Sequence, residues 1–559
     1  MLRNLERNFI QLIKESIFKD FPSLKSTPLN INLEIPKDKR HGDLTTSIAL
    51  QLSSAIRKEP VEIAEILKKR LSKLIKNSRL NKKVVNIEVK QPGFINLYLS
   101  DDYLFHLLKI IADSPKKFIS SNLGRGKKIQ IEFVSANPTG PLSIAHGRQA
   151  AVGDALANIF EMCGYRVTRE YFINDEGNQI EALGKSVYAR YLQLYNKEGK
   201  LPKDGYEGDY IMDIAREFNE RFKDRFINDR KEYNLINIVS TFSVNKILRQ
   251  IRKDLEDFGV QMDVWFSQKE LSRKGKVEEI INEFKGQGLV YEKGNALWFK
   301  STNFGDDKDR VLLKSNGEYT YLAPDIAYHK DKYKRRFNQV INIWGPDHHG
   351  YIKRLKAAVS ALGCPEDFVK ILIIQLATLY RNKKPIPMST RKGQYISLRE
   401  LIDEIGVDGA RFFFLMRKTN THLDLDIELA KRKSLENPIY YIQYAHARIS
   451  SIMKNRRKTR KRLSRTNLSL LKTKEEKEII RKLIEFPHII ESIVSNLEPY
   501  FLTMYLRQLA DLFHSFYQKH RVLSEDTLLT AARLKLIRAV KNILSAGLSA
   551  LGISAPTKM

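Results

Sequence analysis

The chain has 559 residues, 42% of them hydrophobic, and a formal net charge of +31 from 96 Lys and Arg against 65 Asp and Glu. That length can hold roughly three or four domains, and the charge favours a polyanion such as nucleic acid or an anionic membrane surface, unless it only reflects a lysine-rich proteome. The two cysteines, Cys163 and Cys364, lie too far apart to build a zinc cluster, and no apolar run reaches the roughly 20 residues of a membrane span.

Residues 1–118 predict a small α+β unit. The N-terminus, MLRNLERNFIQLIKESIF, is charged throughout and has no signal-peptide core, so we expect a cytoplasmic protein. The same stretch has the period of an amphipathic helix over residues 1–20, and a second helical pattern spans residues 59–77. The runs VVNIEV and FINLYL predict strands, and the polar stretch SPKKFISSNLGRGKK that follows predicts a linker.

An α/β domain with a parallel sheet is predicted from residue 119 on. The run KIQIEFVSA has the β-branched and aromatic residues of a strand, and the loop NPTGPL leads from it into a long helix that begins near Ser143 and ends at Gly164. The run RVTREYFI predicts the next strand. A strand–loop–helix–strand unit of this kind begins a parallel sheet with a right-handed crossover.

The second half of the chain divides into a mixed part and a helical part. Residues 190–235 are polar, rich in Tyr and Asp, and irregular, which indicates an insertion. Strand patterns resume with ALWFK, VLLKS, QVINIWG and ILIIQL, and none is evident after about residue 437. The tail has helical periods in LRQLADLFHSFYQ and LKLIRAVKNILSAGLSALG, and it carries 22 Lys and Arg against 9 Asp and Glu from Tyr441 on. We therefore expect an all-helical, basic domain at 437–559.

The strongest chemical pattern lies in residues 132–148, EFVSANPTGPLSIAHGR. A strand ends, a loop turns, and a helix begins at Ser143 with His146 three residues later. A helix N-terminus has unpaired N–H groups and a partial positive charge, so it suits phosphate oxygens. The alternative is an ordinary capped helix with a satisfied histidine.

A second pattern is the loop KPIPMSTRKGQYISL at residues 384–398, where hydroxyl and cationic side chains stand together between Pro and Gly. Such side chains on a loop can hold a triphosphate during phosphoryl or nucleotidyl transfer, although basic loops are often just solvated. A third pattern, WGPDHHG, follows the apolar run QVINI, at a position where open α/β sheets bind ligands. Its Asp347, His348 and His349 have no further ligand at suitable spacing, so we expect no metal site.

These segments resemble one known family. ANPTGPLSIAHGRQAAVGDALANIFEMCGYRVTREYFINDEGNQI is similar to the ATP-binding signature of class I aminoacyl-tRNA synthetases in its arginyl form, and MSTRKG stands where that class has its second, lysine-containing signature. DGARFFFLM, LENPIYYIQYAHARI and LGISAPTKM resemble the arginyl-type helical anticodon-binding domain. HGDLTTSIAL and QPGFINLYL resemble the arginyl family's extra N-terminal domain. The resemblance covers nearly the whole chain.

The resemblance implies a fold and its domain bounds. We expect an α/β protein with a Rossmann-type parallel-sheet catalytic domain, an α+β N-terminal domain and an all-α C-terminal helical bundle. The N-terminal domain, for recognition of the tRNA elbow, would span residues 1–118. The catalytic domain would span 119–436 with insertions at about 175–300, and the anticodon-binding domain would span 437–559.

The chain departs from the family pattern in both ATP signatures. The first usually reads His-X-Gly-His, and here it is Ser143-Ile144-Ala145-His146. Ser143 can still donate one hydrogen bond to a phosphate, whereas Ala145 adds a methyl group where the family's glycine lets adenine approach the backbone. In the second signature the usual lysine corresponds to Thr390, so another cation must replace it.

The resemblance implies ATP-dependent activation of L-arginine to arginyl-adenylate, followed by transfer to the 3′ end of tRNA(Arg). The implied cofactors are ATP and the Mg²⁺ bound with it, the implied partners are tRNA(Arg), L-arginine and ATP, and we expect a monomer without membrane contact. A synthetase-like enzyme for another amino acid and a catalytically impaired tRNA-binding relative are the alternatives.

The resemblance also implies site residues. For catalysis these are His146, Lys392 and Arg391. For ATP they are Pro138, Ser143, Ala145, His146, Met388 and Ser389. A guanidinium is planar, permanently charged and needs carboxylates in fixed geometry. The matching positions for arginine are Glu132, Asn137, Tyr321 and Asp325. Without the resemblance, Asp325 would be interpreted as a helix cap, because PDIAYHKDK has the pattern of a helix start.

The implied tRNA contacts lie in two places. Phe94 and Asn96, in the segment PGFIN, match positions that read the tRNA elbow, where an aromatic face stacks on a base and an amide bonds its edge. Arg456 and Arg457 belong to a run from Lys454 to Arg465 with eight cationic residues among twelve. We expect this run to contact the tRNA backbone, although a solvated basic face is the alternative.

Overall fold

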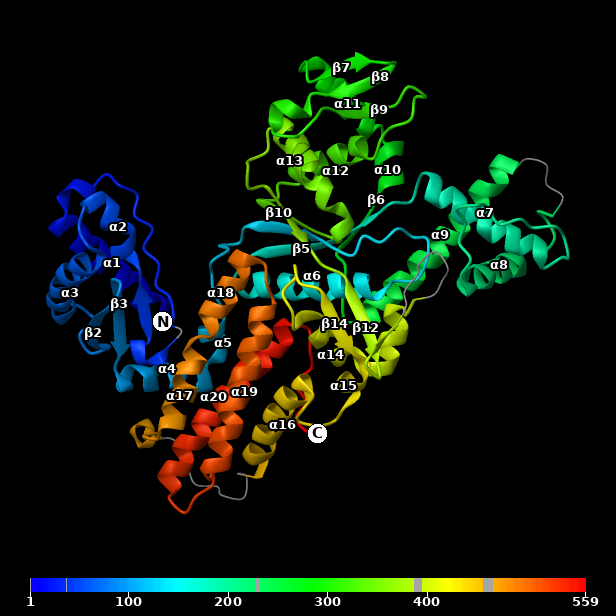
Figure 1. Cartoon of the computed structure of the whole chain (residues 1–559). Coiled ribbons are helices and arrows are strands. Elements are labelled where there is room, and N and C mark those ends of the chain that lie inside the picture. Colours follow the sequence, from blue (N-terminus) through cyan, green and yellow to red (C-terminus); the bar gives the residue numbers. More distant parts are fainter. Residues whose placement is uncertain (1, 37, 228–231, 387–394, 456–465) are drawn as a thin grey trace.

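The computed structural model describes residues 2–36, 38–227, 232–386, 395–455 and 466–559. Figure 1 shows an N-terminal unit at one side, a central sheet with two insertions, and a bundle of long helices below the sheet. In the described residues, no helix is long and apolar enough to cross a membrane.

The N-terminal unit is a three-stranded antiparallel sheet, in the order β1-β3-β2, covered by helices. Its first helix buries one face completely, and this face consists of Leu5, Phe9, Ile13 and Ile17. The predicted amphipathic face is therefore confirmed. The elements are α1 (Leu2–Asp20), β1 (Leu44–Thr46), α2 (Ile48–Ile56), α3 (Pro60–Lys76), β2 (Val84–Lys90), β3 (Phe94–Leu99), α4 (Asp101–Asp113) and α5 (Pro115–Ile119). The short helix α5 lies inside the stretch predicted to be a linker, so that prediction was wrong there.

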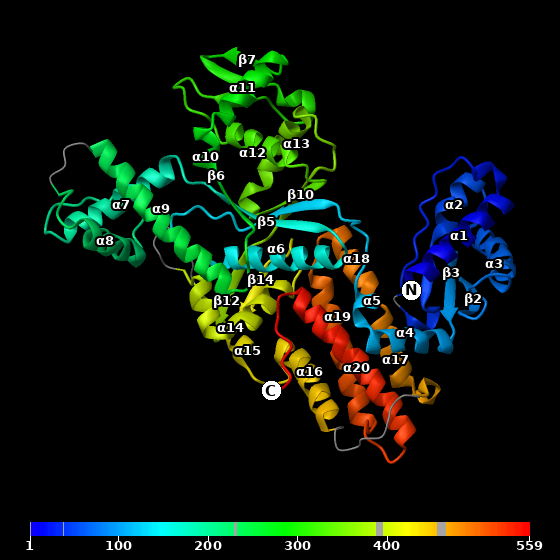
Figure 2. The same ribbon diagram turned by 180° about the vertical axis from the view of Figure 1, so that it is seen from behind.

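The central sheet has five parallel strands in the order β11-β10-β4-β5-β6. Helix α6 covers one of its faces and α12 the other, as Figures 1 and 2 both show. The elements are β4 (Lys128–Glu132), α6 (Ile144–Met162), β5 (Arg166–Ile173), β6 (Val264–Ser267), β10 (Gln339–Trp344) and β11 (Val369–Ile373). The predicted parallel sheet and its crossover helix are confirmed. Strand β4 ends earlier than KIQIEFVSA suggested, because Val134 and Ser135 have positive φ angles that turn the chain out of the sheet.

Two insertions flank the carboxyl edge of this sheet. The first is helical: α7 (Asn178–Gln193), α8 (Asp209–Phe222) and α9 (Glu232–Asp257). Helix α8 lies inside residues 190–235, which the sequence pattern described as irregular. Its buried face of Ile211, Ile214, Ala215 and Phe218 packs in the insertion, and the intervening polar residues hid it. The second insertion contains α10 (Gln268–Arg273), α11 (Lys276–Gly286), β7 (Val290–Lys293), β8 (Ala296–Phe299) and β9 (Arg310–Leu313). The chain then returns to the central sheet through α12 (Leu322–Lys334), and α13 (Ile352–Ala361) connects β10 to β11.

A second small sheet, in the order β13-β12-β14, and the helical bundle complete the chain. Helix α14 begins at a capping box of Ser397 and Glu400, and α17 at one of Thr473 and Glu476. The elements are β12 (Ala377–Arg381), β13 (Lys384–Pro385), α14 (Leu398–Leu415), β14 (Leu423–Asp426), α15 (Ile427–Lys431), α16 (Pro438–Asn455), α17 (Lys474–Ile484), α18 (Phe486–Asn496), α19 (Tyr500–Lys519) and α20 (Thr527–Ala550). In the described residues after 437 no strand occurs, as predicted.

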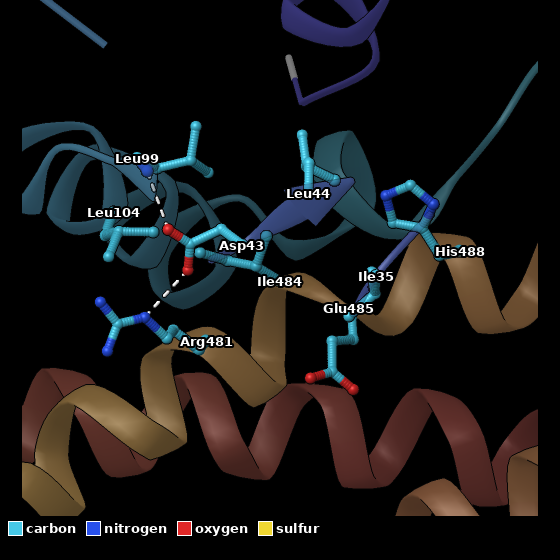
Figure 3. Close-up of a pocket in the computed structure, with 9 residues that line it drawn as sticks. All are labelled: Ile35, Asp43, Leu44, Leu99, Leu104, Arg481, Ile484, Glu485 and His488. Carbon is cyan, nitrogen blue, oxygen red and sulfur yellow. Dashed lines mark hydrogen bonds and ion pairs between the residues drawn. The ribbon is translucent and has the colours of Figure 1, made fainter. Parts of the chain in front are cut away.

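The N-terminal unit packs on the helical bundle through buried apolar residues, with α4 against α20 and α17, and ion pairs add to this interface. Figure 3 shows Asp43 accepting hydrogen bonds from the backbone N–H of Leu99 at 2.8 Å and from Nε of Arg481 at 2.9 Å. Lys477 pairs with Asp101 at 2.8 Å along the same interface. Further pairs join Arg3 to Glu491 and Glu6 to His488. We call these contacts the domain-joining pairs.

Candidate active site

The central sheet reverses its strand order next to β4. The chain passes from β4 to β5 and β6 on one side and then returns to β10 and β11 on the other. Open α/β sheets bind ligands at such a point, outside the carboxyl ends of the strands. The crevice between the ends of β4 and β10 is therefore the candidate site, and Glu132 and Trp344 are the last residues of these two strands.

The N-terminus of α6 faces this crevice and carries Ser143 and His146. The backbone N–H of Ser143 donates to Nδ1 of His146 at 3.2 Å. Nδ1 is therefore the acceptor, and Nε2 carries the proton of the neutral ring. Burial lowers the pKa of His146 to about 4, against the smaller opposing effect of the Asp347 charge. At neutral pH His146 is thus an uncharged donor beside the helix end.

Three tyrosines hold the loop between β4 and α6 by its carbonyl groups. The hydroxyl of Tyr171 donates to Ala136 at 2.7 Å, that of Tyr210 to Thr139 at 2.8 Å, and that of Tyr395 to Pro141 at 3.0 Å. They come from β5, from α8, and from the residues just before α14. The loop carries the buried Pro138 and the exposed Asn137. Its backbone is therefore fixed by side chains from three separate parts of the chain.

Arg148 lies one turn further along α6 and fixes the position of this helix. It is fully buried, and its guanidinium donates to the carbonyl groups of Gln375 at 2.7 Å, Lys418 at 2.9 Å and Thr421 at 3.0 Å. These carbonyls lie next to β12 and β14. The position of the α6 N-terminus is thus tied to the second sheet, a role that the sequence patterns did not indicate.

The carboxylates expected to bind arginine lie near each other at the crevice. Glu132 is buried at the end of β4, and Asp325 is half-buried in the first turn of α12. Tyr351 donates to Asp325 Oδ2 at 2.5 Å. Burial raises the pKa of Asp325 to about 7; the Tyr351 hydrogen bond lowers it, the Glu132 charge raises it, and the Lys332 charge lowers it. Helix α12 begins at Leu322, so Asp325 is not its N-cap and the helix-cap interpretation was wrong.

The other two expected arginine contacts are exposed. Tyr321, the residue before α12, is 66% exposed, and Asn137 donates from Nδ2 to Gln179 Oε1 at 2.7 Å. Both lie on the segments that carry Asp325 and Glu132. Their expected roles stay predictions.

Sequence patterns missed Lys332, which contacts Glu132 and whose charge also acts on Asp325. Its side chain is fully buried, and Nζ donates to Glu132 Oε2 at 2.5 Å and to Asn342 Oδ1 at 2.9 Å. Lys332 lies two helical turns after Asp325 on the same face of α12. That spacing was the available signal, but a lysine in a helix of mixed charge is usually solvent-exposed.

A second buried ion pair lies beside the first. The carboxylate of Glu170 on β5 is fully buried and accepts hydrogen bonds from Arg335 at 2.5 and 2.9 Å and from the Tyr328 hydroxyl at 2.6 Å. Burial opposes ionisation, but Arg335, Lys332 and the Tyr328 hydroxyl together hold the pKa of Glu170 below its usual value. We call the two pairs, Glu132–Lys332 and Glu170–Arg335, the buried polar layer. It lies where α12 and the residue after it, Arg335, meet β4 and β5.

The second signature loop falls outside the described residues, and with it Met388, Ser389, Thr390, Arg391 and Lys392. The chain just after it pairs with the start of α6: the backbone N–H of Leu398 donates to Leu142 at 2.7 Å, and Ser397 bridges Ser143. The two signature segments are therefore neighbours at their described ends.

The segment WGPDHHG forms a short 3₁₀ helix, Pro346–Tyr351, at the end of β10. Asp347 and His348 have exposed side chains there. Across the described ranges, no group of three or more His, Cys, Asp or Glu residues could hold a metal ion.

The expected tRNA contacts have different surroundings. Phe94 is half-buried at the start of β3. Asn96 is 1% exposed, and the Thr45 hydroxyl donates to its carbonyl oxygen at 2.5 Å, so its amide supports the sheet and the structure does not favour a base contact. Arg456 and Arg457 lie outside the described residues.

Helices α16 and α19 present an aromatic cluster that the sequence patterns missed. The Arg448 guanidinium lies 4.5 Å from the ring centre of Tyr444 and 4.8 Å from that of Tyr517. Tyr444 also stacks on His514, with 6.0 Å between ring centres. Flat rings beside a guanidinium are the usual means of stacking unpaired bases of a single strand.

Three family models match the chain in order. "Arginyl tRNA synthetase N terminal domain" matches residues 5–99, "tRNA synthetases class I (R), catalytic domain" matches 107–451, and "DALR anticodon binding domain" matches 442–559. Together they cover nearly the whole sequence.

Curated relatives and solved structures are similar over the full length. An arginine–tRNA ligase of Citrifermentans bemidjiense is 46% identical over 532 residues, 95% of each chain. One of Geobacillus kaustophilus is 45% identical over 535 residues, 95% of this chain and 94% of the relative. The arginyl-tRNA synthetase structure of Thermus thermophilus has a TM-score of 0.79 and 21% identity, covers all of both chains, and shows the shared fold.

Proposed function

Because this chain belongs to the arginyl-tRNA synthetase family, with a class I catalytic domain, we propose that the crevice between β4 and β10 activates arginine and the helical bundle holds the tRNA. The chain is an arginine–tRNA ligase, an aminoacyl-tRNA synthetase that uses ATP. The full-length match to arginine–tRNA ligases favours this function over an impaired tRNA-binding relative.

The reaction has two steps. The carboxylate of arginine attacks the α-phosphate of ATP, which gives arginyl-adenylate and pyrophosphate. The terminal adenosine hydroxyl of tRNA(Arg) then attacks the acyl carbon and releases AMP. Neither step needs a covalent protein nucleophile, so the chain must orient the reactants and stabilise charge that grows on phosphate oxygens.

On the ATP side, we assign the phosphates to the N-terminus of α6. The N–H groups of its first turn and Nε2–H of the neutral His146 ring are donors at one end of the helix, where the Ser143 hydroxyl lies 3.1 Å from His146 Nδ1. We assign Pro138 and Ala145, which flank the same helix end, to the nucleotide as well. A neutral histidine donates a hydrogen bond without adding a second charge to a site whose loop supplies the cations.

On the arginine side, the observation that carries the assignment is the pair of carboxylates at the crevice. Among the described residues no cation contacts Asp325, and Glu132 lies close enough for its charge to affect it. A guanidinium that reaches Asp325 gains a charge-assisted pair in a partly desolvated site. Asn137 and Tyr321 stand on the adjoining segments, where polar contacts to the rest of the amino acid are available.

We propose that Mg²⁺ enters with ATP, on the phosphate oxygens, since the described residues offer no cluster of metal ligands. We also propose a monomer in the cytoplasm, as the family resemblance implies. For the tRNA we assign Arg448, Tyr444 and Tyr517 to unpaired bases, and Phe94, Arg456 and Arg457 to other parts of the molecule. The domain bounds 1–118, 119–436 and 437–559 are proposed with them.

The loop at 387–394 tests the ATP side. Thr390 cannot supply the charge of the usual lysine, and Lys392 or Arg391 is proposed to replace it. We expect Lys392→Ala to reduce ATP–pyrophosphate exchange by about 10²–10³-fold, as loss of a charge-stabilising donor does. Near-parental exchange in both Lys392→Ala and Arg391→Ala would show that the charge comes from elsewhere. Thr390→Lys, measured with and without tRNA, tests whether the missing lysine makes activation depend on tRNA.

A further inference from the structure

A continuous series of hydrogen bonds connects the carboxylate of Glu132 with the backbone carbonyl of Asp325, the two acidic residues of the proposed arginine pocket. Lys332 Nζ donates to Glu132 at 2.5 Å and to the side-chain oxygen of Asn342 at 2.9 Å. The amide nitrogen of Asn342 lies 2.9 Å from Nε2 of His329, and Nδ1 of His329 lies 2.8 Å from the carbonyl oxygen of Asp325. The three links through Asn342 and His329 have ordinary hydrogen-bond lengths, and the Lys332–Glu132 contact is shorter.

The middle links are closed to solvent. Lys332 and Asn342 are 0% exposed and His329 is 3% exposed. Burial and the Lys332 charge together hold the pKa of His329 well below its usual range, so its ring is neutral. A neutral ring that accepts from Asn342 at Nε2 donates from Nδ1 to the Asp325 carbonyl, which gives the series one direction from Lys332 to Asp325.

The two acidic residues at the ends of this hydrogen-bond series differ in their counter-ions. Glu132 has Lys332 as a buried counter-ion, whereas Asp325 has a tyrosine hydroxyl and, within the ranges that the structure describes, no cation in contact. Only one of the two carboxylates is therefore uncompensated, which matches the single charge of a guanidinium. Two uncompensated carboxylates so close together would repel each other, and one of them would take up a proton.

We propose that Lys332 is a positioning residue for arginine: it neutralises Glu132 and, through Asn342 and His329, fixes that carboxylate relative to Asp325. The proposal rests on the proposed function of the pocket. Lys332 does not touch the substrate; it acts through Glu132. Its ammonium also lies 4.2 Å from the ring centre of Tyr328, which limits its movement.

The test is the Michaelis constant for arginine in ATP–pyrophosphate exchange, measured with saturating tRNA. Lys332→Met keeps the length of the side chain and removes the charge. It should raise the KM for arginine by about 10- to 100-fold, the value of a lost hydrogen bond to a charged group, and leave the KM for ATP unchanged. Lys332→Arg should restore most of the affinity, because it keeps the counter-ion.

The matched control is Lys330→Met on the same helix. Lys330 pairs with Glu283 on α11 rather than with Glu132, so this variant should leave both Michaelis constants at parental values. A double-mutant cycle with Glu132→Gln separates a positioning role from a loss of packing. If Lys332 acts through Glu132, adding Lys332→Met to Glu132→Gln should change the arginine KM much less than it changes the parent's.

Three results would overturn the proposal: an unchanged arginine KM in Lys332→Met, an equal rise in the KM values for arginine and ATP, or full additivity with Glu132→Gln. If Lys332→Met does not fold, Asn342→Leu breaks the series one link further on, and an unchanged arginine KM in that variant would overturn the proposal. A parent enzyme that activates no arginine would instead refute the proposed function, so the two failures are distinguishable.

Discussion

The Glu132–Lys332 pair of the buried polar layer and the Lys477–Asp101 pair among the domain-joining pairs are both ion pairs, but their surroundings differ. The side chains of Lys332 and Glu132 are 0% and 8% exposed, whereas those of Lys477 and Asp101 are 33% and 49% exposed. Desolvated partners hold one geometry, and losing one of them leaves an uncompensated charge. Exposed pairs exchange easily with water and contribute little each. The arginine pocket is therefore built on a desolvated pair, while the Lys477–Asp101 pair adds little to an interface that buried apolar residues already hold.

The largest effect expected from this comparison is on stability. Glu170→Gln removes the buried charge that Arg335 and Tyr328 contact. We expect the free energy of unfolding, measured by urea denaturation, to fall by about 3 kcal/mol, as for other broken buried pairs. A loss no larger than that of an exposed pair would show that the buried layer is not held by its charges.

The next effect concerns the substrate. Asp325→Asn removes the only uncompensated carboxylate proposed for the pocket. Truncating one partner of such a charge pair costs about 2–5 kcal/mol, so the arginine KM should rise by about 30-fold or more. The KM for ATP should not change. An unchanged arginine KM would remove Asp325 from the pocket.

The raised pKa of Asp325, about 7, predicts a pH dependence for arginine binding. The ionised carboxylate binds the cation, and the carboxyl is protonated below its pKa. Arginine affinity should therefore rise by about tenfold from pH 6 to pH 8, as the ionised fraction grows from roughly a tenth to nine tenths. Calorimetric titration of parent and Asp325→Asn at both pH values measures this; the variant should lose the dependence. An affinity that is flat in the parent contradicts the assignment.

The raised pKa of Asp325 makes the stability of the chain fall with rising pH, whereas it makes arginine affinity rise. The folded-state pKa of Asp325 lies above its unfolded value, so the native chain binds the extra proton. This group's stabilising contribution is full below the unfolded pKa and is lost as pH rises through about 7. Bound arginine should offset that loss, because the guanidinium favours the ionised carboxylate.

The smallest effect is expected at the domain-joining pairs. Lys477→Ala should lower the free energy of unfolding by no more than about 1 kcal/mol, and less at high salt, because the pair with Asp101 is partly exposed. Thermal melts at low and high salt would measure it. A loss as large as that of Glu170→Gln would remove the distinction between the two regions.

Sequence patterns correctly predicted the helices and strands whose hydrophobic residues recur at a regular spacing. The α1 face of Leu5, Phe9 and Ile13, the strand–loop–helix start of the sheet, and the helical C-terminal part all follow from spacing and composition. They missed α5 and α8, because short or highly polar helices have the composition of loops.

The site was predictable only in part. Glu132, Ser143 and His146 lie in one motif, and resemblance brought in Asp325 from far along the chain. Lys332 could not be found this way, because its role depends on β4 and α12 meeting in space, which no local pattern reports. The tRNA assignment of Asn96 stays a prediction: its motif position suggested a base contact, and in the structure its carbonyl oxygen accepts from Thr45 inside the sheet.

Charging of total tRNA, assayed with each labelled amino acid in turn, tests the central claim most directly. The account predicts that the chain charges tRNA with arginine alone, because only a guanidinium matches Asp325 beside the Lys332-compensated Glu132. Charging with another amino acid, or tRNA binding without any charging or AMP formation, would contradict it.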